Sequence, residues 1–171
     1  MPYVAPLERE NAPQDAQPVL DAIEEKFGRS LNLFNTLARQ PDVLKGVTEV
    51  NDGIQRDLPD KLRELAYLKS SLLNNCEYCS HYHSAAAKKA GVTDAQIDAL
   101  DRFAESDEFD EQERAVLAYA AELTKTADVQ PETVDAVKQF LDDTQLVTLA
   151  ATVALANFTN RVNHGLGIEL P

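Results

Sequence analysis

The sequence predicts an all-α protein, a single-domain helical bundle of roughly seven or eight helices. Apolar residues recur at the three- and four-residue spacing of amphipathic helices, and no stretch alternates in the two-residue period of a strand. Glycine or asparagine follows several of these stretches, and proline opens others. A chain of 171 residues without internal repeats or long linkers suits one core, so we expect one domain over residues 1–171.

The first third of the chain is expected to form an extended arm followed by short helices. Prolines recur near the N-terminus and favour an extended surface arm over residues 1–17. A first helix then begins near Pro18 and ends at Gly28, where glycine suits a C-terminal cap. Residues 32–54 are typical of two short helices separated at Gln40-Pro41, because a residue before proline avoids the α region.

The middle of the chain predicts three consecutive helices. Residues 58–75 carry a helical apolar pattern and end in two asparagines, which tolerate a left-handed cap. A second helix is expected over about 76–91, where it stops at a glycine. The segment 92–100 then opens with a capping-box pattern formed by Thr93 and Gln96.

The last third predicts two amphipathic helices, over residues 110–126 and 131–143, and a long helix over 144–167 that ends at Gly165 or Gly167. The longest apolar run lies in the last helix. It is short for a bilayer span and includes threonines and an asparagine, so we expect a buried helix.

The charge of the chain narrows the classes of partner. A formal net charge of −13 argues against nucleic-acid and anionic membrane partners, both of which need a cationic patch. The N-terminus lacks the basic start and apolar stretch of a secretory signal, so we expect a cytoplasmic protein. In that reducing compartment a close cysteine pair is typical of redox chemistry or metal binding rather than of a permanent structural disulfide.

Residues 74–83, NNCEYCSHYH, contain both cysteines and two of the three histidines of the chain. At about 100° per residue, a helix brings Cys76, Cys79 and His83 onto one stripe. Cys76 lies at or just before the helix start, where the backbone N–H groups and the helix dipole lower the pKa of a nearby thiol. Two thiols in this spacing can form a disulfide, and a histidine one turn later can accept or return a proton.

Glu64 is the candidate third member of this group. It lies on the preceding predicted helix, on the side that carries Leu68 and Leu72, both of which we expect to be buried. If the two helices form a hairpin about Asn74-Asn75, the carboxylate can reach His83, orient the imidazole and stabilise its charged form.

Two other interpretations of the cysteine pair compete with redox chemistry. Buried cysteines can be inert packing residues. Zinc could also take Cys76, Cys79, His81 and His83, but histidines two apart on a helix point about 160° away from each other. One helix therefore cannot place all four around one ion. We expect His81 at the surface or an interface, and neither metal nor cofactor.

The motif E-x(11)-C-x-x-C-x-x-x-H, from Glu64 through Cys76 and Cys79 to His83, resembles the carboxymuconolactone decarboxylase and alkylhydroperoxidase D superfamily, in its peroxidase-related, CxxC-containing branch. The resemblance extends over most of residues 18–170, with a motif-bearing core at 58–100. It implies the alkylhydroperoxidase D-like helical fold.

The resemblance also implies a thiol-dependent peroxidase that reduces a hydroperoxide with an external dithiol or thiol protein, and a homo-oligomer (dimer, trimer or hexamer). Cys79 would pass its proton toward His83 and Glu64, and Cys76 would complete the disulfide; which cysteine attacks first stays open. Tyr78 stands where alkylhydroperoxidase D commonly has a histidine. It is a candidate supporting residue, but it cannot act as a base at neutral pH.

Two further functions are weighed against the peroxidase. Lactone decarboxylation names the superfamily, but those enzymes generally do without the cysteine pair. A non-catalytic helical oligomer, whose cysteines sense oxidation or hold a metal, is the other alternative.

Overall fold

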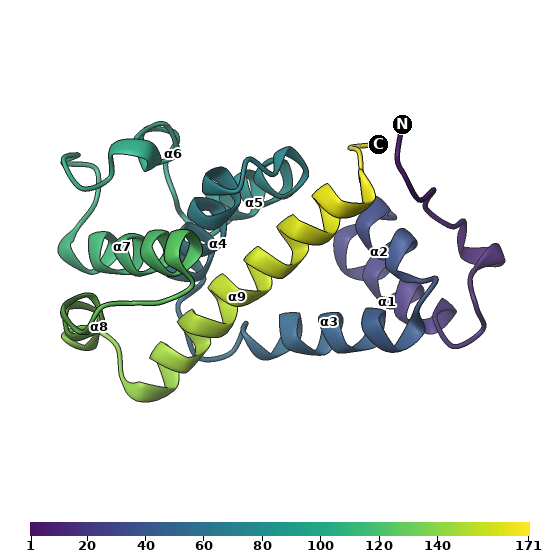
Figure 1. The fold of residues 1–171 in the computed structure, drawn as a ribbon, viewed down its shortest axis with the longest axis horizontal. Helices are drawn as coiled ribbons and strands as arrows, with labels where there is room; N and C mark the ends of the chain where they lie inside the picture. The colour runs from purple at the N-terminus through teal and green to yellow at the C-terminus, as the bar shows by residue number, and fades with distance from the viewer. The chain divides into compact units, whose positions relative to one another are not determined.

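The computed structural model describes residues 1–171, all of them in an α-helical fold without strands. The α-helices in Figure 1 are α1 (Gln17–Phe27), α2 (Asn32–Leu37), α3 (Pro41–Gly53), α4 (Asp60–Leu73), α5 (Glu77–Lys89), α6 (Asp94–Asp98), α7 (Glu111–Thr126), α8 (Pro131–Lys138) and α9 (Asp143–Leu166). Two 3-10 helices lie at Arg9–Asn11 and Leu100–Arg102. The all-α prediction is confirmed, with nine α-helices against the seven or eight expected.

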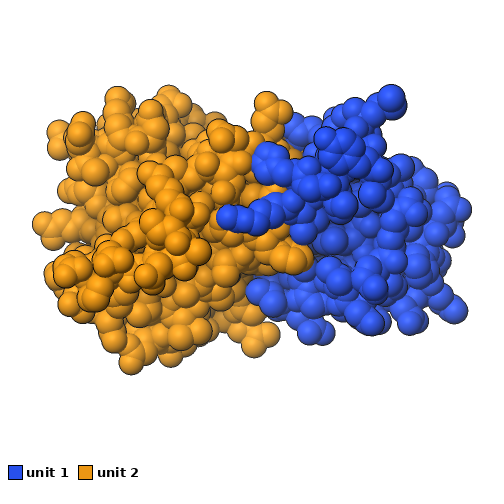
Figure 2. All heavy atoms as spheres, in the orientation of Figure 1, with its two compact units in different colours: residues 1–52, 161–171 blue, residues 53–160 orange.

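The chain divides into two compact units, shown in two colours in Figure 2. Residues 1–52 and 161–171 form the first unit, and residues 53–160 form the second. Helix α9 contributes residues to both units. The expectation of a single domain over residues 1–171 stays a prediction.

The first unit contains α1, α2 and α3 and the two ends of the chain. The residues before the first 3-10 helix have no helical structure and are held by backbone hydrogen bonds. The Tyr3 N–H donates to the Leu166 carbonyl at 3.0 Å, and the Leu7 N–H donates to the Asn35 carbonyl at 3.2 Å. These bonds replace the helical hydrogen bonds that this proline-rich segment cannot make.

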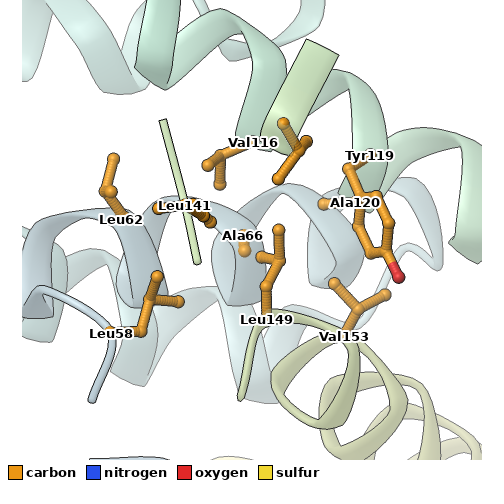
Figure 3. Packing of buried hydrophobic residues seen from close by; sticks show 10 residues of the cluster. Leu58, Leu62, Ala66, Val116, Tyr119, Ala120, Leu141, Leu149 and Val153 are labelled. Atoms are coloured by element: carbon orange, nitrogen blue, oxygen red, sulfur yellow. The ribbon is translucent and has the colours of Figure 1, made fainter. Parts of the chain in front are cut away.

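The second unit is built around α4, which packs against α5 and α7, while α7 packs in turn against α8. One apolar cluster joins α4, α7 and the first part of α9 (Figure 3). It consists of Leu58, Leu62, Ala66, Val116, Tyr119, Ala120, Val137, Leu141, Leu149 and Val153. A second cluster joins α4 to α5, α7 and the segment between them. Because α4 contributes to both clusters, its position is fixed from two sides.

Local sequence signals set where these helices begin and end. Thr93 and Gln96 form the predicted capping box at the start of α6, with reciprocal side-chain and backbone hydrogen bonds. Gly28 and Gly167 follow α1 and α9 with φ values of 69° and 62°, the left-handed conformation that glycine adopts at low cost. None of the helices combines the length and the apolar character needed to cross a membrane.

Two valines on α9 test the contribution of this core. Val153 is fully buried in the cluster, whereas Val147 is 69% exposed. Val153→Ala should lower the free energy of unfolding by about 2 kcal/mol, because it removes apolar contacts and leaves a cavity. Val147→Ala, the matched control on the same helix, should change it by less than about 0.5 kcal/mol. Urea denaturation measures both, and equal effects would contradict this packing.

Candidate active site

A tight turn between α4 and α5 brings the predicted site residues together. Asn75 adopts the left-handed conformation, with φ of 52°, which asparagine tolerates better than most residues. The N–H of Cys76 then donates to the Ser71 carbonyl at 2.9 Å, closing the turn. The chain therefore reverses directly, and α5 packs along α4. This hairpin places residues of α5 opposite residues of α4. Glu64 and His83, 19 positions apart in the sequence, are brought together in this way.

Cys76 is the N-cap of α5. Its Sγ accepts a hydrogen bond from the N–H of Cys79 at 3.4 Å, and its backbone is extended. The sulfur therefore faces the unpaired N–H groups and the positive end of the helix dipole, where a thiolate is favoured. Both cysteines are buried and neither is in a disulfide, so the structure shows the reduced pair.

Cys79 lies one turn into α5 with its Sγ 3.8 Å from the Thr159 Oγ1 of α9. The hydrogen bond to Cys76, burial and the charge of Cys76 raise the pKa of the Cys79 thiol far above its ordinary value. Hydrogen bonds with Asn160 and Thr159 act in the opposite direction. The two sulfurs are therefore unequal: Cys76 is placed to carry the negative charge, and Cys79 keeps its proton.

Glu64 and His83 meet across the hairpin. The Glu64 Oε2 lies 2.8 Å from the His83 Nδ1, and the Glu64 Oε1 lies 3.3 Å from a guanidinium nitrogen of Arg63. Burial alone would raise the pKa of Glu64, but the hydrogen bond and charge of His83, together with Arg63, lower it below its ordinary value. The carboxylate is therefore ionised at neutral pH and accepts from both neighbours.

The protonation of His83 follows from that contact. A carboxylate only accepts hydrogen bonds, so Nδ1 must carry the hydrogen that Glu64 receives. In the neutral ring the unprotonated nitrogen is then Nε2, which is the nitrogen able to accept a proton. The Tyr67 ring stacks on the imidazole with 3.5 Å between centroids and 12° between planes, so the ring is held on its face as well as at its edge.

Two polar residues of α9 lie against this hairpin, Asn160, which is fully buried, and Asn157, which is half-buried. Asn160 accepts from the Asn74 side chain at 2.8 Å and donates to the Ser71 hydroxyl at 3.2 Å. Asn157 accepts from the same Asn74 amide at 3.0 Å. These bonds tie α9 to the end of α4, directly below the turn that positions Cys76.

The other two sequence candidates take structural positions. Tyr78 is buried and packs against Tyr82, with 4.9 Å between ring centroids. His81 is exposed, as expected, and meets the edge of Tyr82. No group of three or more histidine, cysteine or acidic side chains is arranged to hold a metal ion. The Nδ1 atom of His83 is also occupied by Glu64.

The expectation that Leu72 is buried is wrong. Leu68 is fully buried, but Leu72 is 42% exposed. The reason is its place in the last turn of α4. Residues 64–71 are buried on every side of the helix, whereas Leu72 lies where the helix ends and leaves the packed core.

Comparisons with known proteins bear on the family and the fold of this chain. Residues 41–122, which include α4 and α5, match the Carboxymuconolactone decarboxylase family. Residues 41–122 belong to the carboxymuconolactone decarboxylase family. The chain is also similar to the uncharacterized protein YdfG of Bacillus subtilis (strain 168), with 29% identity over 107 residues, 61% of this chain and 73% of YdfG.

Solved structures extend the likeness over nearly the whole chain. A cysteine-to-alanine variant of the debrominase Bmp8, in complex with 2,3,4-tribromopyrrole, is 27% identical, covers 98% of this chain and 91% of its own, and has a TM-score of 0.84. An uncharacterized peroxidase-related protein with an alkylhydroperoxidase AhpD core, from Ralstonia eutropha JMP134, is 23% identical, covers 99% and 92%, and has a TM-score of 0.87. The second likeness shows the fold.

The family match, over residues 41–122, leaves out two residues that contact the site. Thr159 and Asn160 lie on α9, beyond residues 41–122, and sequence reasoning missed them together with Tyr67. The sequence does carry a signal for Thr159 and Asn160. They are polar residues in a stretch predicted to be buried, and a buried polar group needs a hydrogen-bond partner. Tyr67 carries no such signal, because a tyrosine is ordinary on a helix.

The Glu64–His83 contact predicts how stability depends on pH. Because the folded-state pKa of Glu64 is lowered, the contact stabilises the fold above its ordinary pKa of 4.5 and loses this effect as pH falls below that value. Glu64→Gln should lower the free energy of unfolding by about 2 kcal/mol at pH 7. The difference from wild type should shrink at more acidic pH.

Denaturant unfolding of wild type and variant from pH 7 down to pH values below that point measures this difference. Glu105→Gln, which removes the same charge from an exposed position, is the matched control and should show little effect at any pH. A constant loss across the pH range in Glu64→Gln would contradict an ionised Glu64 in contact with His83.

Proposed function

We propose that this protein is a thiol-dependent peroxidase that reduces hydroperoxides with Cys76 and Cys79. The observation that carries the proposal is the inequality of the two sulfurs at the start of α5. Cys76 Sγ accepts from the α5 backbone, while the pKa of Cys79 is raised, first of all by its hydrogen bond to Cys76. A peroxidase of this kind needs one thiolate to attack and one thiol to resolve the product.

The first step is attack of the Cys76 thiolate on the outer oxygen of the hydroperoxide. The O–O bond breaks, a sulfur–oxygen bond forms, and the alkoxide takes a proton to leave as an alcohol. Cys76 is then a sulfenic acid. Two electrons have passed from the sulfur to the peroxide.

The second step joins the two cysteines. Cys79 loses its proton and attacks the Cys76 sulfur, the S–O bond breaks, and the leaving hydroxide combines with the proton as water. The unprotonated Nε2 of His83, one turn beyond Cys79 on α5, is the base we assign, and Glu64 orients it and stabilises its protonated form. An external dithiol then reduces the Cys76–Cys79 disulfide by exchange.

Replacement of Cys79 by serine tests the order of attack. In Cys79→Ser, one equivalent of hydroperoxide should leave a sulfenic acid on Cys76, because no thiol remains to resolve it. Labelling with dimedone and mass spectrometry should find that adduct on Cys76, while dithiol-dependent turnover is lost. Full peroxide turnover by Cys79→Ser would sink the proposal. In the matched variant Cys76→Ser, dimedone labelling of Cys79 at the wild-type rate would reverse the order of attack.

The two histidines of α5 test the relay. His83→Ala should lower peroxide turnover by about a hundredfold, the ordinary contribution of a general base. His81→Ala, on the exposed side of the same helix, should retain turnover. Steady-state consumption of a hydroperoxide with a dithiol reductant measures both variants, and circular dichroism establishes that each is folded. Equal rates for the two variants would contradict a relay through His83.

Reductive dehalogenation is the second candidate function, favoured by the likeness to the debrominase Bmp8 over 98% of the chain. Here the same two thiols would reduce a brominated aromatic ring: the carbon–bromine bond is replaced by carbon–hydrogen, bromide leaves, and the disulfide forms. Release of bromide from a brominated pyrrole, dependent on both Cys76 and Cys79 and faster than hydroperoxide reduction, would favour this function over the first.

A further inference from the structure

Two buried hydroxyl groups connect Cys79 to the His83 stack by a route outside α5. The Thr159 Oγ1 of α9 lies 3.8 Å from the Cys79 Sγ and 2.6 Å from the Tyr67 hydroxyl of α4. The ring of Tyr67 in turn stacks on His83. One tyrosine therefore contacts the imidazole with its face and Thr159 with its hydroxyl.

The hydrogen-bonding capacity of Thr159 is filled in the reduced state. Its hydroxyl has one hydrogen and two lone pairs. The hydrogen can go to the Leu155 or Ala156 carbonyl of α9, each at 3.1 Å, and the lone pairs can accept from Tyr67 and from the Cys79 thiol. The carbonyls belong to helix α9 and bond within it, so the Thr159 hydrogen can leave them at small cost.

The Tyr67 hydroxyl keeps its hydrogen and can donate it in this arrangement. Burial raises the pKa of the Tyr67 hydroxyl well above the ordinary value, and the hydrogen bond with Thr159 only partly offsets this. The hydroxyl therefore stays protonated across the pH range in which thiols ionise. A hydrogen bond from Tyr67 to Thr159 leaves the Thr159 hydrogen free to turn toward the Cys79 sulfur.

We propose that Tyr67 and Thr159 form a donor chain, from Tyr67 O–H to Thr159 O–H to Cys79 Sγ, that activates Cys79 as the resolving thiolate. This inference rests on the proposed thiol function and names positioning residues for its second step. In that step, Cys76–SOH and the Cys79 thiol give the disulfide and water. The chain supplies hydrogen bonds to the sulfur while His83 takes the proton.

The donor chain explains how the attack by Cys79 can follow the oxidation of Cys76. While Cys76 is a thiolate, its hydrogen bond and charge raise the pKa of Cys79, and the thiol keeps its proton. Oxidation to a sulfenic acid removes that charge. The bonds from Thr159 and Asn160, which lower the pKa of Cys79, then act unopposed by a neighbouring anion.

The charged and polar groups that act on the donor chain come from helices α4, α5 and α9. Cys76 and His83 face it from α5, and Glu64 acts on Tyr67 from α4. Helix α9 contributes the neutral side chains of Thr159 and Asn160. A change at Thr159 therefore alters a hydrogen bond without altering the charge of the site.

The test uses the full-length Cys76→Ser variant, which leaves Cys79 as the sole thiol and removes the neighbouring charge. The rate of its reaction with iodoacetamide, followed by mass spectrometry against pH, reports the thiolate fraction of Cys79. Added Thr159→Val should slow this reaction about tenfold at a pH below the midpoint, since a hydrogen bond to a charged group is lost. Thr159→Ser, which keeps the hydroxyl, should react nearly as fast as the parent.

Thr152→Val is the matched control, because Thr152 is a buried threonine of the same helix whose hydroxyl donates to the Thr148 carbonyl. It should leave the rate unchanged. Tyr67→Phe keeps the stacked ring and removes only the outer donor, so it should slow the reaction less than Thr159→Val does.

Equal rates in the Thr159→Val and Thr152→Val proteins would overturn the proposal. If Thr159→Val does not fold, as judged by circular dichroism, an unchanged rate in Tyr67→Phe overturns it instead. The alkylation needs no peroxide, so the donor chain can fail while peroxide turnover is retained. Loss of the proposed function would equally leave the alkylation result standing.

Discussion

The contact between the Glu64 carboxylate and the His83 imidazole is the constraint on which the site depends. It joins two helices at 2.8 Å and requires a reversal of the chain within Asn74 and Asn75. The same reversal places Cys76 at the N-terminus of α5, where its sulfur meets backbone N–H groups. One turn of backbone therefore determines both the position of the His83 imidazole and the environment of the Cys76 sulfur.

Polar side chains of α9 hold the turn between α4 and α5 in place through hydrogen bonds. Burying such groups is costly unless each finds a partner, and here hydrogen bonds link Asn157 and Asn160 to Asn74. A sliding or rotation of α9 against α4 would break several of these bonds at once. We infer that the polar cluster fixes the register of α9, which an apolar contact alone would specify less sharply.

The local features of this fold could be predicted from the sequence. The capping box of α6, the break before Pro41 and the left-handed end of α4 depend on residues within a few positions of one another. The pairing of Glu64 with His83 was expected on the condition that the two helices form a hairpin about the two asparagines. Long-range docking could not be predicted in this way.

Thr159 shows why. It lies 80 residues beyond Cys79, and their contact depends on how α9 packs against α4, which no periodicity of either segment determines. The burial of Leu72 was wrongly expected for a related reason, since the neighbouring helices, and not the spacing within α4, determine where its last turn leaves the packed core. The division into two units has no sequence signal either, because the helical pattern of α9 continues across it.

The central claim is that Cys76 and Cys79 act as one two-electron couple. The most direct measurement is a titration of the reduced protein with a hydroperoxide, without reductant, followed by free-thiol counting and peptide mass mapping. The account predicts that one equivalent removes both thiols of a chain and yields a Cys76–Cys79 disulfide. Thiols that survive an excess of hydroperoxide, or that are lost only to disulfides between chains, would contradict it.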